Sequence, residues 1–404
     1  MGLNRRDLIV VTLVMLLFMA KQMFHDERYK RRIYTLSPAH PTEMVSQAFA
    51  NVAEKGKYSS HSFVWPATRW EEVTRSSRVC LVTQGSVDRI FWVARQAEAF
   101  RGPVSMAIYA PGSDYAVALA MVSYLKYCFP AVQENVSFHI MYSRKYPPKF
   151  STEYKAPPLS CSDPEGVNRL LMVLLGKENS IIKHYPQNHM RNLARRACPC
   201  ENVLTVDIDM VAAPYMNGML SNFLSTTKQT APCKKCAYVV PLYEIQDDAE
   251  FPRNKTELLN LIQNHRARIF HEKVYSKNQG NARFHEYWEI QPDKEDSRKY
   301  QVLYDIENYE ERWEPILVLP ISAPFFDERF VGFGCNRYSQ VYELHLRKYN
   351  FKVLDTAFLV HRGFQTRAKY PHWRPREIQE NLERYKEFKN EIHKKLKIKQ
   401  SFLL

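Results

Sequence analysis

Asn202-Val-Leu-Thr-Val-Asp-Ile-Asp-Met210 is the most informative stretch of the 404-residue chain. Its apolar, β-branched residues up to Val206 predict a strand that is buried on both faces. Asp207 and Asp209 follow directly, with one residue between them. Ligands of open α/β sheets bind at the carboxyl ends of strands, and two aspartates there need a positive charge between them. A divalent metal that carries a diphosphate would supply it, and a polar turn is the plainer alternative.

The chain before this stretch alternates between predicted strands and helices. Strands are predicted at 79–83, 104–109 and 136–141, and helices at 87–100 and 115–128. This order predicts an α/β domain with a parallel sheet and right-handed crossovers, which is the plan of a mononucleotide-binding half.

The loop after the first predicted strand carries Gln84 and Asp88 and would lie at the nucleotide edge of the sheet. Its sequence contains neither a Gly-x-Gly-x-x-Gly nor a Walker signature. These patterns cradle phosphates in dinucleotide dehydrogenases and P-loop enzymes, so both classes are disfavoured.

A polar helix that opens at Tyr185-Pro186 precedes the aspartate strand. Asn188, Asn192 and Arg195 share one face of it, and Arg191 lies beside Asn192 on the same side. Two amides and one or two guanidinium groups could hold the base, ribose or phosphates of a nucleotide. The alternative is a solvated face, but the position just before the aspartate strand favours a binding role.

The N-terminus contains an uncharged apolar segment that follows Arg5-Arg6. Its thirteen residues, 8–20, would span about 20 Å as a helix, less than the roughly 30 Å of a bilayer core. Length alone suits a cleaved signal peptide, but the cleavage signal is poor and Lys21 could snorkel. We therefore predict a signal anchor with its N-terminal side in the cytoplasm. The predicted organisation is a cytoplasmic tail at 1–7, the anchor at 8–24, a stem at 25–75 and a folded domain at 76–400.

Charge and cysteine content agree with a lumenal domain. Fifty-seven Lys and Arg against 43 Asp and Glu give +14, which nucleic acid, an anionic membrane or an anionic small substrate could explain. The excess is spread along the chain, which argues against nucleic acid. The eight cysteines suit disulfides, ahead of a zinc site built from Cys198, Cys200, Cys233 and Cys236 or a redox motif. Sequons at Asn135 and Asn254 are weaker support.

The last third of the chain carries further polar candidates. Asp327 lies in a loop between aromatic residues, where its pKa would rise and it could act as a base. An ion pair with Arg329 is the alternative. His361 follows an apolar run, which suits a metal ligand, although a lone histidine is more often structural. Three other histidines match no metal motif and are expected at the surface: His265, His271 and His285.

Several motifs, in one order, resemble glycosyltransferase family 49 over roughly residues 75–395. They are Arg191-Asn-Leu-Ala-Arg195, Val206-Asp-Ile-Asp-Met210, Val239-Val-Pro-Leu-Tyr-Glu244, Asn254-Lys-Thr-Glu-Leu258, Phe326-Asp-Glu-Arg-Phe330, Phe333-Gly-x-Asn336 and Phe358-Leu-Val-His-Arg-Gly-Phe364. The resemblance implies a GT-A nucleotide-diphosphosugar transferase fold, a single-pass type II Golgi membrane protein, Mn²⁺ or another divalent metal, and an inverting mechanism. Asp207 and Asp209 match the metal and nucleotide motif, and His361 matches a histidine that would complete the metal site.

The resemblance also suggests roles in catalysis. Asp327, with Glu343 in reserve, is the predicted base that takes a proton from the acceptor hydroxyl. Arg191 and Arg195 are candidates to bind the carboxylate of glucuronate.

The predicted reaction moves glucuronate from UDP-glucuronate to a xylose-terminated glycan of the protein O-mannosyl type on a glycoprotein. UDP-N-acetylglucosamine as donor is one alternative. A non-catalytic partner of another Golgi transferase is the second, and the intact Asp-x-Asp argues against it. Association with other Golgi transferases is a further expectation. Residues 143–185 match the family poorly, which leaves the acceptor open.

Overall fold

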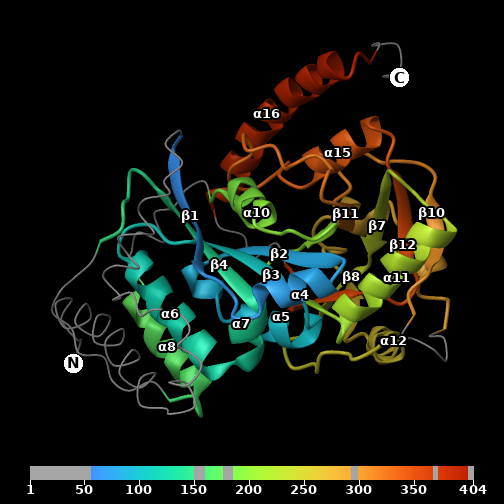
Figure 1. Cartoon of the computed structure of the whole chain (residues 1–404). Coiled ribbons are helices and arrows are strands. Elements are labelled where there is room, and N and C mark those ends of the chain that lie inside the picture. Colours follow the sequence, from blue (N-terminus) through green and yellow to red (C-terminus); the bar gives the residue numbers. More distant parts are fainter. Residues whose placement is uncertain (1–55, 150–159, 176–184, 293–298, 367–371, 399–404) are drawn as a thin grey trace.

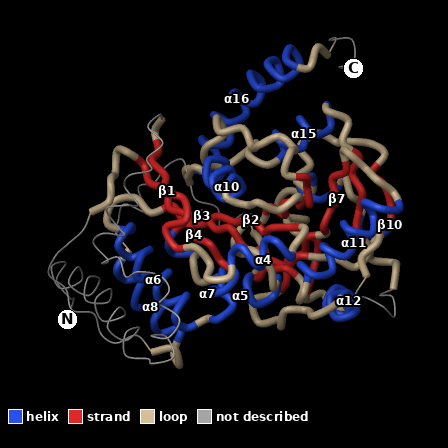
Figure 2. The backbone as a smooth tube through the Cα atoms, in the orientation of Figure 1, coloured by secondary structure: helices blue, strands red, loops and turns tan. Residues whose placement is uncertain are grey.

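The computed structural model describes residues 56–149, 160–175, 185–292, 299–366 and 372–398 (Figure 1). A nine-stranded sheet with the order β1-β4-β3-β2-β5-β11-β7-β12-β10 runs through its centre, and helices lie around it (Figure 2). The predicted anchor at 8–24 lies outside the described residues. Among those described, none of the helices has the length and apolar content needed to span a membrane.

The first half of the sheet is the parallel unit that the apolar runs predict. β2 (Val79–Ser86) pairs in parallel with β3 (Val104–Tyr109) and with β5 (Asn202–Thr205), and β3 pairs in parallel with β4 (Val136–Ser143). Every residue of β3 is buried, as expected for a strand covered on both faces. The carboxyl end of β5 therefore presents Asp207 at the ligand edge of the sheet.

The second half of the sheet is mixed. β11 (Ile316–Pro320) runs antiparallel to both of its neighbours, β5 and β7 (Cys236–Val240). β12 (Asn350–Leu354) is parallel to β7, and β10 (Val302–Ile306) completes the edge. A mononucleotide-binding half continued by a mixed half confirms the predicted α/β fold of GT-A type. The antiparallel direction of β11 also brings its first residues to the edge where β5 and β7 end.

A second sheet has the order β6-β13-β8-β9. Its strands are β6 (Met210–Ala212), β13 (Leu359–Arg362), β8 (Leu242–Ile245) and β9 (Ala267–Ile269). β13 is antiparallel to β6, in a register that sets His361 opposite Met210. A histidine near the C-terminus is thereby carried to the Asp-x-Asp segment.

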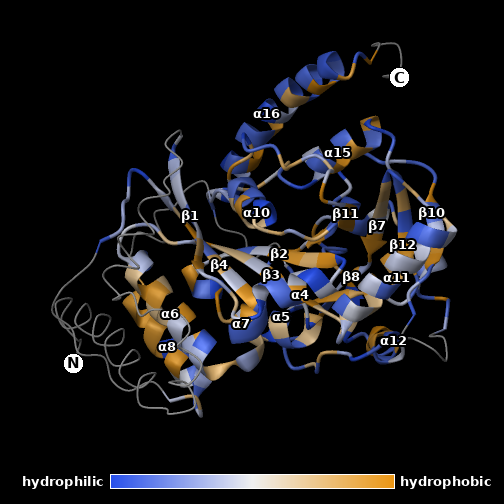
Figure 3. Ribbon diagram, viewed as in Figure 1, coloured by the Kyte–Doolittle hydropathy of each residue, from blue (hydrophilic) through white to orange (hydrophobic). Residues whose placement is uncertain are grey.

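Helices cover the large sheet, and α10 (Gln187–Arg196) packs over β2 and β3. The other helices are α4 (Trp70–Ser76), η1 (Val87–Arg89), α5 (Trp92–Phe100), α6 (Asp114–Cys128), α7 (Pro130–Asn135), α8 (Pro164–Leu174), α11 (Met216–Thr230), α12 (Lys255–Gln263), α13 (Lys277–Gly280), α14 (Phe284–Tyr287), α15 (Tyr338–Leu346) and α16 (Arg374–Lys395). α16 is mostly hydrophilic (Figure 3) but buries Tyr385 and Phe388 in a small aromatic cluster with Phe330. This packing fixes the C-terminal helix beside α15.

The folded domain begins earlier than the predicted boundary at residue 76. β1 (Tyr58–Trp65) is an edge strand of the large sheet, antiparallel to β4. Its burial does not follow a clean alternation, and its sequence is rich in serine, so periodicity does not reveal it. Residues 58–76 therefore belong to the domain rather than to the predicted stem.

Disulfides account for six of the cysteines. The pairs are Cys80–Cys198, Cys128–Cys161 and Cys233–Cys236, and the thiols of Cys200 and Cys335 are free and buried. The preference for disulfides over a four-thiolate zinc site is confirmed. Cys80–Cys198 links β2 to the end of α10, which carries the polar face predicted to bind nucleotide.

Candidate active site

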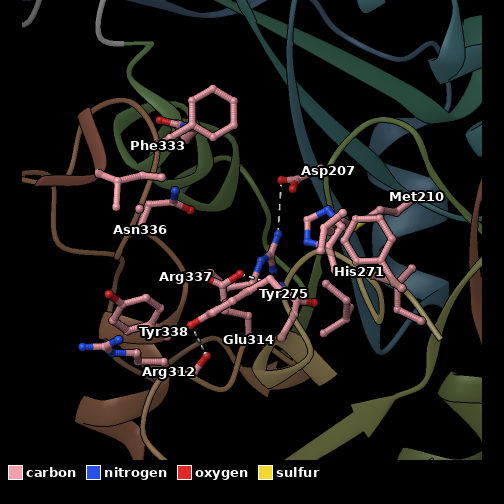
Figure 4. A pocket seen from close by; sticks show the side chains of 18 of the residues that line it. Asp207, Met210, His271, Tyr275, Arg312, Glu314, Phe333, Asn336, Arg337 and Tyr338 are labelled. Carbon is pink, nitrogen blue, oxygen red and sulfur yellow. Dashed lines mark hydrogen bonds and ion pairs between the residues drawn. The ribbon is translucent and has the colours of Figure 1, made fainter. Parts of the chain in front are cut away.

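A cavity of about 470 Å³ lies at the carboxyl edge of the large sheet (Figure 4). Its wall is built from both sheets, α10 and the beginnings of α15 and α16. Its charged side chains and its histidine come from distant parts of the chain: Arg191, Asp207, His271, Arg312, Glu314, Arg337 and Arg374. Gln84, predicted at the nucleotide edge, also lines the cavity. The cavity is therefore the candidate active site.

Asp207 is held by two guanidinium groups. Its Oδ1 lies 2.8 Å from Arg191 Nη2 and 3.1 Å from Arg337 Nη2, and Gln84 donates to the same atom at 3.3 Å. Burial alone would raise the pKa of Asp207, but the two arginine charges and the hydrogen bonds outweigh it and hold that pKa well below its usual range. Asp207 is therefore negatively charged at neutral pH.

The second aspartate of the Asp-x-Asp motif, Asp209, lies beside His361. Asp209 Oδ2 lies 3.5 Å from His361 Nε2, and Arg89 Nη1 lies 3.3 Å from the same oxygen. His361 Nδ1 faces the carbonyl oxygen of Gly363 at 3.2 Å, so this nitrogen carries the proton in the neutral ring. Nε2 then carries a lone pair on the side of Asp209, as a metal ligand requires, and the amide nitrogen of Gln365 lies 3.5 Å from it.

The donor set around Asp209 fits a hard or borderline divalent cation. Within the described residues, no cluster of three or more His, Cys, Asp or Glu side chains is arranged to hold a metal ion. A metal ion bound by one carboxylate and one imidazole would therefore need oxygens of a bound diphosphate to complete its coordination shell. Binding through few protein ligands plus substrate phosphates is common for Mg²⁺-like cations, and manganese accepts the same oxygen and imidazole ligands.

The polar face of α10 turns mainly toward protein backbone rather than toward the cavity. Asn188 Nδ2 donates to the carbonyls of residues 327 and 336, and Asn192 binds both backbone groups of Phe326. Arg195 donates to the carbonyls of residues 321, 323 and 324. Of the predicted face, only Arg191 lines the cavity. Asn188, Asn192 and Arg195 were predicted to contact the sugar-nucleotide donor. In the structure they have a structural role instead, because their side chains anchor the 321–336 segment.

The carboxylates predicted as bases lie outside the cavity lining. Asp327 Oδ1 accepts from Arg329 Nε at 2.9 Å, which is the ion pair considered as the alternative. Glu343 lies on α15 and pairs with Arg347 at 2.6 Å. Asp88, predicted near the nucleotide, is on η1 and accepts a hydrogen bond from Ser86 without lining the cavity. These carboxylates bind local arginine and serine side chains instead of lining the cavity.

Several residues of the cavity were not predicted as site residues, among them Arg312, Arg337 and Glu314, and His271 was expected elsewhere. Glu314 lies two residues before Ile316, the first residue of β11, and its Oε2 accepts a hydrogen bond from Asn278 at 2.6 Å. Burial raises the pKa of Glu314 to about 7, and nearby arginines only partly offset this. His271, expected at the surface, lines the cavity, where burial lowers its pKa to about 4. No local sequence pattern marks either residue: Glu314 reaches the cavity through the antiparallel direction of β11, and His271 reaches it through tertiary packing.

Comparison with known proteins places the chain in a family. A family model described as glycosyl-transferase for dystroglycan matches residues 78–397. Beta-1,4-glucuronyltransferase 1 of Bos taurus is 31% identical over 327 residues, which cover 78% of this chain and 75% of that protein. The Danio rerio protein of the same name is 27% identical over 331 residues, covering 80% and 74%. The xylosyl- and glucuronyltransferase LARGE2 of Rattus norvegicus is 26% identical over 288 residues, covering 71% of this chain and 34% of that protein.

The matched region contains the whole cavity lining, from Gln84 to Leu382. It also contains Asp209 and His361. The chain therefore belongs to the glycosyl-transferases for dystroglycan, glycosyltransferase family 49, and is itself a glycosyltransferase.

Proposed function

We propose that this enzyme transfers glucuronate from UDP-glucuronate to a xylose-terminated glycan on a glycoprotein, with inversion at the anomeric carbon. The observation that carries the proposal is the charge of the cavity. Its lining holds Arg191, Arg312, Arg337 and Arg374 against two carboxylates. A sugar with its own carboxylate, attached to an anionic diphosphate, suits such a wall better than uncharged N-acetylglucosamine does.

The arginines differ in what they can offer to a sugar. The terminal nitrogens of Arg191 donate hydrogen bonds to Asp207, Asn188 and Asn336. Those of Arg337 donate to Asp207 and to the carbonyl of Thr205. These two therefore present a fixed positive wall rather than a bidentate clamp. We propose Arg312 as the residue that binds the sugar carboxylate, in the place first considered for Arg191 or Arg195.

We propose that Asp209 and His361 hold Mn²⁺, with Asp207 contributing negative charge beside them. The bound ion would neutralise the diphosphate and stabilise the UDP that leaves. Arg191, Arg337 and Gln84 fix the Asp207 carboxylate in place, so the site does not have to reorganise when the donor binds.

We also propose that the enzyme is a type II Golgi membrane protein, with the anchor at 8–24 and the domain in the lumen. The three disulfides support a compartment that is oxidising. Expression of a tagged full-length chain, followed by protease protection of microsomes, tests this topology. A tag at the C-terminus that is digested in sealed microsomes contradicts the proposal.

The donor is tested by transfer assays with purified protein, Mn²⁺ and a β-xyloside acceptor. Across a panel of UDP-sugars we expect UDP-glucuronate to turn over and UDP-N-acetylglucosamine to fail. Turnover of N-acetylglucosamine without glucuronate contradicts the proposal. Arg312→Met should lower kcat/KM for UDP-glucuronate by roughly 10- to 100-fold and leave the affinity for UDP alone unchanged, because the lost contact is to the sugar.

The metal site is tested with Asp209→Asn and His361→Ala. Both variants should raise the Mn²⁺ concentration needed for half-maximal activity, since each removes one of the two proposed protein ligands. His285→Ala is the matched control, because that exposed imidazole pairs with Glu289 and Glu272 instead. An Asp209→Asn enzyme that keeps full function in cells would favour the non-catalytic alternative.

A further inference from the structure

Glu314 and Asp207 reach the cavity from neighbouring strands of opposite direction. Asp207 follows the carboxyl end of β5, and Glu314 precedes the first residue of β11, which is antiparallel to β5. The end of β5 and the beginning of β11 lie at the same edge of the sheet. Both carboxylates consequently line one cavity, and in Figure 4 Arg337 lies between them.

The Glu314 carboxylate is held by a buried amide network. Asn278 Nδ2 donates to its Oε2 at 2.6 Å, and the backbone nitrogen of Glu314 donates to the carbonyl of Asn278 at 2.8 Å. Gln279 Nε2 donates to the carbonyl of Glu314 at 3.0 Å and to Asn278 Oδ1 at 2.9 Å. Both amide residues are almost fully buried. A carboxylate that lines a cavity, accepts a hydrogen bond from a buried amide and has its backbone fixed by the same two amide residues is preorganised for a reaction.

The surroundings of Glu314 are mixed in charge. The charged and titratable groups that act on it or feel its charge lie on α10, after β5, on the 275–278 segment and at the starts of α15 and α16: Arg191, Asp207, Tyr275, Cys335, Arg337, Tyr338 and Arg374. Burial dominates this balance and raises the pKa of Glu314 to about 7. A carboxylate in this range can both lose and accept a proton near neutral pH.

We propose that Glu314 is the general base of the transfer reaction. The assignment rests on the proposed function only in that the acceptor is a sugar hydroxyl. The acceptor oxygen forms its bond to the anomeric carbon while the bond from that carbon to the diphosphate oxygen breaks. The electron pair of the broken bond leaves with UDP, and the hydroxyl proton passes to the carboxylate of Glu314. Asn278 is a positioning residue, because it acts through its hydrogen bond to Glu314.

Glu314→Gln tests the proposal because it keeps the shape and the acceptance of the Asn278 bond but removes the basic oxygen. We expect kcat to fall about 10²- to 10⁴-fold, while the affinity for UDP with Mn²⁺, measured by calorimetry, stays within about threefold. The acidic limb of the wild-type pH profile of kcat should vanish in the variant. Glu311→Gln is the matched control, since this exposed acid pairs with Lys389 outside the cavity.

The outcomes separate this assignment from other roles. A Glu314→Gln enzyme with kcat within tenfold of wild type, or with an unchanged acidic limb, overturns it. Loss of UDP affinity together with turnover also overturns it, because Glu314 would then belong to the donor site. If the glutamine variant does not fold, Glu314→Asp replaces it. That variant retracts the carboxylate by one methylene and should lose at least tenfold in kcat, so wild-type kcat in it overturns the assignment.

The identity of the donor sugar and the identity of the general base are tested independently. The assays use whichever UDP-sugar the panel identifies, so a donor other than UDP-glucuronate defeats the proposed donor and leaves the comparison of Glu314 variants intact. Asn278→Ala adds a readout of positioning: kcat should fall less than in Glu314→Gln, and the acidic limb should move to higher pH, because the amide no longer stabilises the charged carboxylate.

Discussion

Asp207 and Glu314 line the same cavity but have opposite electrostatic environments. Asp207 faces two guanidinium groups, which hold its pKa well below the usual range. Glu314 receives a hydrogen bond from the neutral amide of Asn278, and burial raises its pKa to about 7. Pairs of carboxylates whose pKa values are driven apart commonly divide their work, one remaining charged and one exchanging a proton. The two environments therefore indicate a charge holder and a proton acceptor.

The largest effect on stability should come from Asp207→Asn, which removes a carboxylate that is ionised at neutral pH. Arg191 and Arg337 would lose their shared carboxylate, and breaking such a pair costs about 3 kcal/mol of unfolding free energy. Activity should fall by on the order of 10³-fold, because the arginines that Asp207 orients also line the cavity in which we propose that the donor binds. Urea unfolding and transfer assays measure the two effects. Asp305→Asn is the control, since this exposed aspartate pairs with Lys352.

A second test changes the pKa values of both Asp207 and Glu314 with one substitution. Arg337 lowers the pKa of Asp207 and of Glu314, so Arg337→Met should raise both. The acidic limb of kcat should then move to higher pH, while Asp207 stays ionised because Arg191 remains. The pH dependence of kcat between pH 5 and 9 measures this shift. An acidic limb that stays in place would show that the titrating group is not in contact with the Arg337 charge; Arg196→Met, at an exposed pair with Glu328, is the control.

The Asp207 side of the cavity was largely predictable, and the Glu314 side was not. The apolar run up to Val206 and the alternation before it predict a parallel sheet with Asp207 at its ligand edge, and the structure has this arrangement. Glu314 depends on the antiparallel direction of β11, which no local pattern reveals. Asp327 looked more suitable because of its aromatic neighbours, but Arg329 pairs with it two residues away.

Other differences have the same physical origin. Helical periodicity correctly put Asn188, Asn192 and Arg195 on one face, but it could not tell whether that face meets a ligand or a backbone segment 130 residues later. His361 reaches Asp209 through the pairing of β13 with β6, which is a long-range contact. Sequence patterns describe local structure well, whereas the partner of a polar face is decided by tertiary packing.

The environments also predict opposite effects on stability. The pKa of Glu314 rises from 4.5 to about 7 on folding, so its contribution is fully present below pH 4.5 and is lost as pH rises through 7. Asp207, with a lowered pKa, contributes above its unfolded value of 3.8 and loses that contribution as pH falls. The unfolding free energy of wild type minus that of Glu314→Gln should decrease by at most about 3 kcal/mol between pH 5 and 8. A difference that rises or stays flat contradicts the environment described for Glu314.

The smallest effect should come from Asp327→Asn. Its ion pair with Arg329 is near the surface and is worth at most about 1 kcal/mol, and its carboxylate lies outside the cavity lining. Turnover should stay within about threefold of wild type, with an unchanged acidic limb, in the same assay that is used for Glu314→Gln. A loss of 10²-fold or more would place the proton transfer at Asp327. The contrast between Asp207 and Glu314 would then describe a charged wall around the donor, and the base would have to reach the acceptor from the 321–336 segment that α10 anchors.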